Sequence, residues 1–216
     1  MEKILNLMAT IIKPFHLEFF HSESIPLAKA SSTSKIPIDF FNENYVNYFF
    51  SKGRPNFQLG GLENMGYSCY LNSILQCLSY TPGFRQFCQE LPNSLYLANE
   101  SDAFFLDSLG KTFDQMEHKK AYLPEWVIQD LGYINEVFAT PTQQDAHELL
   151  IFLLERLDYE CQKAMVQPGP TFISQLFSGY IKTTISCSSC GFSVDKTNKF
   201  YDFSIPILQQ SSMTEA

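Results

Sequence analysis

The chain has 216 residues, a length that suits one domain with an extension. Hydrophobic residues make up 45% and charged residues 18%, so the chain can bury a core, which excludes a wholly disordered polypeptide. Its 15 Lys and Arg against 23 Asp and Glu give a net charge of −8, and we therefore expect no nucleic-acid partner. The apolar stretch 4–12 is too short to span a bilayer, so we expect no membrane partner either.

Six cysteines are too sparse in a chain of this length for a small disulfide scaffold. Only Cys187 and Cys190 form a C-x-x-C pair. We expect reduced thiols and an intracellular protein of the cytoplasm, the nucleus or both.

Residues 1–58 are expected to form an N-terminal extension. Four consecutive hydroxyl residues, 31–34, predict a loop. The segment 40–50 is rich in Phe and Tyr and is expected to pack against the rest of the chain. The pair Gly60-Gly61 then separates this extension from a region with a different pattern.

Apolar residues spaced for one helical face predict two helices in the first half of that region. The first begins at Cys69 and ends at Thr81-Pro82-Gly83, with an apolar face of Leu71, Ile74, Leu75 and Leu78. The second lies within 101–131, with an apolar face of Phe105, Leu106, Leu109, Phe113 and Met116.

Two more helices are predicted further along the chain. Pro124 suits a first helical turn and is followed by Val127, Ile128 and Leu131. The clearest helix starts near Thr142, because Thr142 and Asp145 have the spacing of a capping-box variant. Its apolar stripe ends before Pro168 and consists of Ala146, Leu149, Leu150, Leu153, Leu154 and Leu157.

The hydrophobic period changes after residue 175. The segments Leu176–Ser186 and Phe200–Ile207 are rich in β-branched and aromatic residues, and the second alternates apolar with polar side chains, so both predict strands. Helices that precede strands indicate an α+β fold.

Cys69 is the first candidate for a reactive group, since it lies at the predicted start of a helix, shortly after Gly66. The partial positive charge and the free N–H groups of a helix N-terminus stabilise a thiolate. The same N–H groups, together with a side-chain amide such as that of Asn64, stabilise an oxyanion. On the residues alone, the alternative is a small buried cysteine without a chemical role.

The stretch Gly61–Gln76 (GLENMGYSCYLNSILQ) resembles the cysteine box of the ubiquitin-specific proteases, whose pattern is G-L-x-N-x-G-N-T-C-Y-M-N-S-x-L-Q. The resemblance implies that Cys69 is the nucleophile of a cysteine peptidase and that Asn64 lines its oxyanion hole. Tyr67 and Ser68 depart from the family's Asn-Thr. The exchange of Asn for Tyr places a bulky ring beside the site, where it would alter access or the conformation of the loop.

A second block, Gln143–Leu150 (QQDAHELL), looks like the family's Q-Q-D-A-H-E-F box. The resemblance implies that Gln143 and Asp145 hold the basic, strongly hydrogen-bonding C-terminal tail of ubiquitin. Helix capping is the alternative role for both residues, and the two roles are compatible. The family's general-base histidine belongs to a later block, followed by an Asp or Asn, so we expect a local packing or hydrogen-bonding role for His147.

The pair Cys187 and Cys190 lies between the two predicted strands, an arrangement typical of a zinc knuckle. Zinc prefers four ligands, and a single C-x-x-C supplies two. Many members of the family carry a second pair, so the resemblance implies half of a structural zinc site, or a remnant that binds no metal. A redox role is disfavoured, because a redox C-x-x-C lies beside a βαβ pattern.

The resemblance implies a papain-like cysteine peptidase fold, with residues 59–216 as part of the catalytic domain: the helical thumb and the first strands of the β fingers. The palm, the catalytic histidine and the second cysteine pair are missing from the sequence, so we expect a chain that is truncated and has low activity alone. The expected function is deubiquitination, the thiol-dependent hydrolysis of the bond after the C-terminal glycine of ubiquitin. Its partners would be ubiquitin and ubiquitinated proteins, and its chemistry needs no cofactor. The alternative is a catalytically inactive ubiquitin-binding or interaction protein.

Overall fold

The structure, a computed structural model, describes residues 43–51, 58–94 and 104–202. The chain divides into two compact units between Leu176 and Phe177. The predicted loop at 31–34, the first aromatic residues of the segment 40–50 and the end of the second predicted strand lie outside the described residues. The domain boundary expected at residue 58 stays a prediction.

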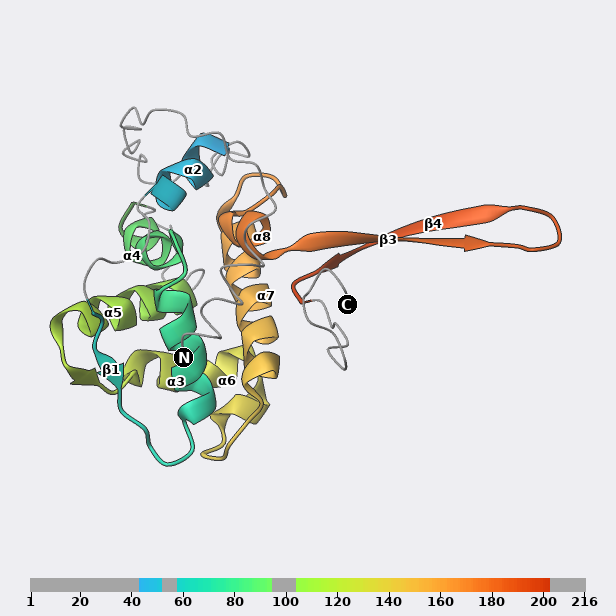
Figure 1. Cartoon of the computed structure of the whole chain (residues 1–216). Coiled ribbons are helices and arrows are strands. Elements are labelled where there is room, and N and C mark those ends of the chain that lie inside the picture. Colours follow the sequence, from blue (N-terminus) through green and yellow to red (C-terminus); the bar gives the residue numbers. More distant parts are fainter. Residues whose placement is uncertain (1–42, 52–57, 95–103, 203–216) are drawn as a thin grey trace. The chain divides into compact units, whose positions relative to one another are not determined.

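The first unit is built mostly from helices (Figure 1). All four predicted helices are present as α3, α5, α6 and α7, whereas α2, α4, α8 and a 3₁₀ helix were not predicted. Across the described ranges, no helix is both long and apolar enough to cross a membrane. In chain order the elements are α2 (Glu43–Ser51), β1 (Gly61–Leu62), α3 (Cys69–Ser79), α4 (Phe84–Ser94), α5 (Phe104–His118), β2 (Ala121–Tyr122), α6 (Glu125–Ile134), the 3₁₀ helix η1 (Glu136–Ala139), α7 (Ala146–Ala164) and α8 (Phe172–Phe177).

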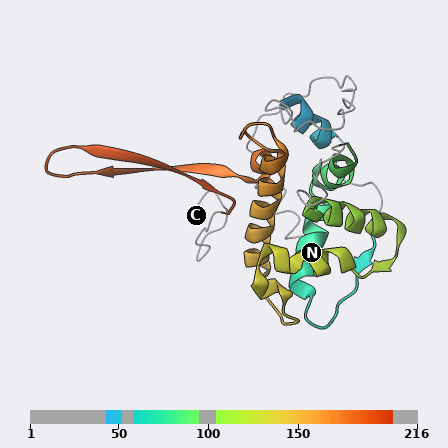
Figure 2. The same cartoon turned by 180° about the vertical axis from the view of Figure 1, so that it is seen from behind.

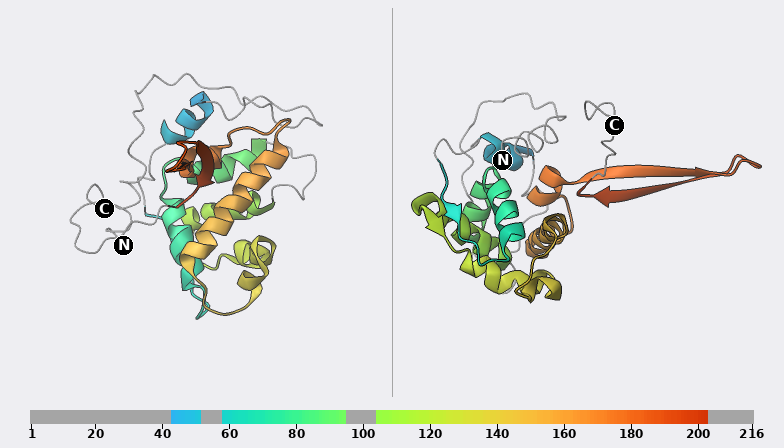
Figure 3. Two further views of the ribbon diagram at one scale, coloured as in Figure 1. Left: turned by 90° about the vertical axis from the view of Figure 1, so that its right-hand side faces the viewer. Right: turned by 60° about the horizontal axis from the view of Figure 1, so that its bottom comes forward.

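Helices α3 and α7 pack against each other through their predicted apolar faces. Leu75 and Leu78 of α3 and Leu149 and Leu157 of α7 are 0% exposed. Burial of one such side chain contributes roughly 1.5–3 kcal/mol, so the two stripes hold the helices firmly together. Both helices start at the same end of the first unit (Figures 1 and 3), which brings the two sequence motifs to that end.

Helix α4 packs against α5 (Figure 3). Its apolar residues Phe84, Phe87, Cys88 and Leu91 follow the helical spacing and are at most 1% exposed. Gly110 of α5 permits the close approach, because a Cβ atom at this position would collide with the backbone of Cys88.

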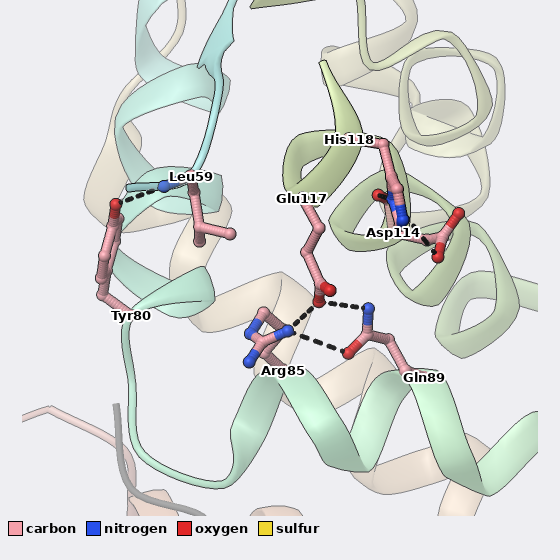
Figure 4. Close-up of polar contacts among 7 residues, drawn as sticks. All are labelled: Leu59, Tyr80, Arg85, Gln89, Asp114, Glu117 and His118. Carbon is pink, nitrogen blue, oxygen red and sulfur yellow. Dashed lines mark hydrogen bonds and ion pairs between the residues drawn. The ribbon is translucent and has the colours of Figure 1, made fainter. Parts of the chain in front are cut away.

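A part-buried ion pair joins the polar sides of these two helices (Figure 4). Arg85 of α4 donates to the carboxylate of Glu117 of α5, and the amide of Gln89 donates to the same oxygen at 2.8 Å. Gln89 also accepts from Arg85 at 3.3 Å. The three side chains therefore pair with one another where the side chain of Arg85 is only 8% exposed.

An aromatic cluster connects α2, α4 and α8. The rings of Phe87 and Phe172 stack with their centroids 4.2 Å apart, and Phe49 contacts them edge-on at 5.8 and 5.4 Å. All three side chains are at most 2% exposed. Such ring pairs add to the free energy of burial. The prediction that the aromatic segment 40–50 packs against the rest of the chain is confirmed for Phe49.

The carboxylate of Glu160, on α7, caps the start of α5 from inside the core. Its oxygens accept from the N–H groups of Phe105 at 3.3 Å and Leu106 at 3.1 Å, and Nε of Arg156 donates to it at 2.8 Å. Burial raises the pKa of Glu160, and these donors oppose that shift. Helices α5 and α7 are thus joined by a polar contact as well as by apolar packing.

The short strands β1 and β2 pair in parallel and hold the chain just before the cysteine motif. The N–H group of Glu63 donates to the carbonyl of Tyr122 at 2.9 Å. Upstream, the N–H group of Leu59 donates to the hydroxyl of Tyr80 at 2.9 Å (Figure 4). The segment that leads to Cys69 is therefore fixed both by β2 and by the residue that follows α3.

The second unit contains an antiparallel hairpin of β3 (Gly179–Ser186) and β4 (Ser193–Phe200), seen as the pair of long strands in Figure 2. The first predicted strand, Leu176–Ser186, is confirmed except for its first three residues. The second predicted strand, Phe200–Ile207, is described only at its start: Phe200 is the last residue of β4, residues 201 and 202 are not in a strand, and 203–207 lie outside the described residues. Strand β4 itself was not predicted. Strand β4 is mostly polar, and its pairing with β3, rather than an apolar alternation, makes it a strand.

Candidate active site

Cys69 is the first residue of helix α3, as predicted, and it is exposed. Its thiol has no hydrogen-bond partner among the described residues. Ser68 takes the N-cap position but makes no side-chain bond to the helix. The thiol is therefore located where the first N–H groups of a helix are open and its dipole is positive.

The other thiols of the first unit are less accessible than Cys69. Cys88 and Cys161 are buried, and burial raises the pKa of both well above the usual value. Cys77 is half-buried, and burial raises its pKa as well. Because a thiol must ionise to attack, these environments disfavour the other three cysteines as nucleophiles.

The side chain of Asn64 is held by the loop that precedes α3. Its Oδ1 atom accepts from the N–H group of Gly66 at 2.9 Å and from the hydroxyl of Ser68 at 3.3 Å. Gly66 has a φ of +90°, a conformation that favours glycine. Both donors lie at Oδ1, so the NH₂ group of Asn64 is left without a partner among the described residues.

Two amide side chains of α3 attach this loop and the strand before it to the helix. Nδ2 of Asn72 donates to the carbonyl of Glu63 at 2.9 Å, and Nε2 of Gln76 donates to the carbonyl of Gly60 at 3.0 Å. Neither Asn72 nor Gln76 was among the predicted site residues. Their place in the cysteine box, one and two helical turns after Cys69, is the signal that could have identified them.

Asp145 is the N-cap of α7. Its Oδ1 atom accepts from the N–H groups of His147 at 2.7 Å and Glu148 at 3.1 Å. The prediction that Thr142 starts this helix is wrong, because Asp145 already satisfies the first N–H groups. Thr142 instead accepts from Nε2 of Gln144 at 2.8 Å, within the preceding loop.

A chain of aromatic rings connects the first turn of α3 with the second turn of α7. Tyr70 stacks on Phe138 with the centroids 6.2 Å apart, and Phe138 contacts Phe152 edge-on at 6.0 Å. Burial, with Tyr67 and Cys69 close by, raises the pKa of Tyr70, so its hydroxyl stays neutral. The structure thus brings the start of α3, which is Cys69, and the second motif to one end of the first unit.

Gln143 and the described histidines complete the predicted polar residues. Gln143 is exposed in the loop before α7, and His147 is exposed on its first turn. His118 lies at the end of α5, where its Nδ1 atom contacts the carbonyl of Asp114 at 2.8 Å (Figure 4). In the part of the chain that the structure describes, no histidine hydrogen-bonds to the thiol of Cys69.

Cys187 and Cys190 are exposed in the turn between β3 and β4 of the second unit. The N–H group of Gly191 donates to the carbonyl of Cys187 at 3.0 Å. Hydrogen bonds from the backbone N–H groups of Cys190 and Ser189 hold the pKa of the Cys187 thiol below its usual value. Two thiols are half of a tetrahedral zinc site, and the described residues include no group of three or more potential ligands.

Most of the chain is similar in sequence to known proteins. Residues 60–212 match the model of the ubiquitin carboxyl-terminal hydrolase family. Ubiquitin carboxyl-terminal hydrolase 25 of Arabidopsis thaliana is 29% identical over 195 residues, which cover 80% of this chain and 28% of that protein. Ubiquitin carboxyl-terminal hydrolase 2 of Rattus norvegicus is 27% identical over 186 residues, which cover 70% of this chain and 30% of that protein.

A human relative has similar identity. Ubiquitin carboxyl-terminal hydrolase 17-like protein 6 of Homo sapiens is 29% identical over 171 residues, which cover 77% of this chain and 42% of that protein. The chain therefore spans between 28% and 42% of the length of these three relatives.

Proposed function

Because its residues 60–212 match that family's model, this chain belongs to the ubiquitin carboxyl-terminal hydrolase family, and we propose that it hydrolyses the bond after the C-terminal glycine of ubiquitin in ubiquitinated proteins. The family consists of thiol proteases with a papain-like fold, whose chemistry needs no cofactor. Residues 59–216 would correspond to the helical thumb and the first finger strands, and residues 1–58 to an extension. Cys187 and Cys190 would supply half of a structural zinc site, in an intracellular protein.

The observation that carries the proposal is the setting of Cys69, an exposed thiol at the start of a helix inside the segment that matches the family. Its thiolate would attack the carbonyl carbon of the C-terminal glycine of ubiquitin and form a C–S bond. Collapse of the tetrahedral intermediate breaks the bond to the leaving amine, which takes up a proton. Water then attacks the thioester, releasing ubiquitin with a free carboxylate and restoring the thiol.

Asn64 is proposed to stabilise the oxyanion of that intermediate. Its unpartnered NH₂ group and the open N–H groups of the first turn of α3 are donors of the kind that this charge requires. Loss of one such donor lowers kcat by about 10²–10³ in a well-studied protease, which is the scale of the contribution proposed for Asn64.

Gln143 and Asp145 are proposed to bind the basic tail of ubiquitin. Asp145 uses one carboxylate oxygen as the helix cap, and its second oxygen has no partner among the described residues. Gln143 is exposed two residues before it. A carboxylate and an amide on the same loop supply an ionic and a neutral hydrogen-bonding group to an extended peptide.

His147 is not proposed as the general base. A general base contributes about 10²–10⁴-fold, and no described histidine hydrogen-bonds to the thiol of Cys69. We therefore expect residues 1–216 by themselves to bind ubiquitin and to hydrolyse its conjugates slowly, by about that factor below a domain that has a base. If His147 serves as the base after all, turnover would be lost in both Cys69→Ala and His147→Ala. A catalytically inactive ubiquitin-binding protein, the alternative, would bind ubiquitin without reacting at Cys69.

The test is the reaction of the polypeptide with ubiquitin that carries an electrophile at its C-terminus. We expect one covalent adduct, mapped by mass spectrometry to Cys69 and absent in Cys69→Ala. Cys77→Ala is the matched control on the same helix and should react normally. Small alkylating reagents would also label the exposed Cys187 and Cys190, so only a ubiquitin-based probe is informative. An adduct that persists in Cys69→Ala would refute the assignment.

A further inference from the structure

Ser68 takes the N-cap position of α3 but does not cap the helix. An N-cap serine normally accepts a hydrogen bond from an N–H group of the first turn. Ser68 makes no such bond, although it is only 2% exposed and directly precedes Cys69. The hydroxyl is used in the loop instead, and the N–H groups at the start of α3 stay open.

The hydrogen bonds of Ser68 have a defined direction. Its Oγ atom accepts from the N–H group of Met65 at 3.0 Å, so its single proton is available for Oδ1 of Asn64 at 3.3 Å. The N–H group of Gly66 is the second donor to that oxygen, at 2.9 Å. An NH₂ group cannot accept from either donor, so the two together determine which end of the carboxamide is the oxygen.

We propose that Ser68 is a positioning residue of the hydrolase reaction, which orients the Asn64 carboxamide so that its NH₂ group is presented to the oxyanion. The catalytic consequence rests on the proposed function, whereas the orientation of Asn64 does not. Without the hydroxyl, one donor remains at Oδ1, and rotation of the carboxamide by half a turn becomes easier. The rotated form would present an acceptor oxygen to a negative charge and would oppose the reaction.

Ubiquitin with a C-terminal aldehyde provides a test that requires no leaving group. The thiol of Cys69 adds to the aldehyde carbon, a C–S bond forms, and the thiol proton goes to the aldehyde oxygen, which occupies the oxyanion position. We expect Ser68→Ala to weaken the affinity for the aldehyde about tenfold, a part of the effect of losing a donor outright. Affinity for ordinary ubiquitin should change less than about twofold, and Ser68→Thr should restore the aldehyde affinity.

Ser73→Ala is the matched control, since Ser73 lies on the same helix and its hydroxyl donates to the carbonyl of Tyr70 at 2.8 Å. It should affect neither affinity. In the Asn64→Ala background, Ser68→Ala should cause no further loss, because Ser68 acts through Asn64. Additive losses in the double variant would overturn the proposal.

The order of the Asn64 side chain tests the positioning role without ubiquitin. ¹⁵N relaxation of its NH₂ group should show greater mobility in Ser68→Ala than in the unaltered polypeptide, and no change in Ser73→Ala. Equal mobility in Ser68→Ala would overturn the proposal even if the aldehyde binds. Failure of the unaltered polypeptide to bind the aldehyde would overturn the proposed function, while the relaxation measurement would still decide the role of Ser68.

Discussion

Asp145 caps α7 and is proposed to bind ubiquitin, and one substitution can separate the cap from the proposed contact, because its two carboxylate oxygens differ in their contacts. Oδ1 accepts from the N–H groups of His147 and Glu148, while the second oxygen has no partner among the described residues. In Asp145→Asn the capping oxygen is kept and the second oxygen becomes an NH₂ donor. Asn caps helices about as well as Asp, so this variant removes the proposed ubiquitin contact and leaves the cap.

The expected magnitudes follow from these contacts. Asp145→Asn should lower the free energy of unfolding by no more than about 0.3–1 kcal/mol, the effect of losing a charge at a helix N-terminus. Asp145→Ala removes the cap and should cost about 1 kcal/mol, at most about 2. A hydrogen bond to a charged group contributes about 1.5–3 kcal/mol, so both variants should weaken ubiquitin binding about tenfold or more. Asp145→Arg should weaken it further, because a like charge then faces the basic tail.

Isothermal titration of ubiquitin into the polypeptide measures the affinity, and urea unfolding followed by circular dichroism measures the stability. Asp114→Asn is the matched control, since Asp114 is an exposed aspartate of α5 and its substitution removes the same charge elsewhere. If Asp145→Asn and Asp145→Arg both bind ubiquitin as the unaltered chain does, Asp145 is a helix cap only, and the proposed tail contact is wrong.

Two further predictions concern stability. Glu160→Gln replaces one of the buried acceptors of the α5 N–H groups by an NH₂ group and should cost about 1–3 kcal/mol in urea unfolding. Burial raises the pKa of the Glu160 carboxyl in the folded chain, so its contribution to the free energy of unfolding is complete below the unfolded pKa and is lost as pH rises through the folded pKa. The free-energy cost of Glu160→Gln should therefore be smaller at pH 8 than at pH 5. A cost that grows with pH would contradict this reasoning. Gly83→Ala should destabilise the chain by at least about 1 kcal/mol more than Gly66→Ala. Both glycines have a positive φ, but only at Gly83 would an added Cβ atom approach the backbone of Phe49, at 2.8 Å. Equal losses of stability in the two variants would contradict the prediction.

The predicted helices are correct where an apolar face is long and uninterrupted. The faces of α3, α5 and α7 have the helical period, and burial of those faces produces the helices that the period predicts. Helix α4 has the same spacing over Phe84, Phe87, Cys88 and Leu91, but a Pro-Gly stop signal precedes it and Pro92 lies in its last turn. Its contacts with Phe49, Phe172 and the backbone beside Gly110 stabilise a helix that the local sequence does not predict.

Strand β4 shows why a polar segment escapes prediction. Its residues before Phe200 are exposed, and the strand does not alternate in polarity. It therefore depends on the ladder of hydrogen bonds with β3 and on the contacts of Asp195 with Lys182 at 2.7 Å and Thr184 at 2.6 Å. Cross-strand pairs of this kind stabilise a sheet without leaving a hydrophobic signature in either strand.

The positions of the two motifs, the helix that begins at Cys69 and the apolar faces of α3 and α7 can all be predicted from the order of the residues. Residue types alone offered Thr142, Gln143 and Asp145 as caps for α7 and indicated no orientation for Asn64. In the folded chain Asp145, rather than Thr142 or Gln143, accepts from the helix N–H groups, and Ser68 and Gly66 both donate to Oδ1 of Asn64. The reason is physical: hydrophobic periodicity records which faces are buried, whereas the partner of each hydrogen bond depends on the dihedral angles of loops packed against the folded helices.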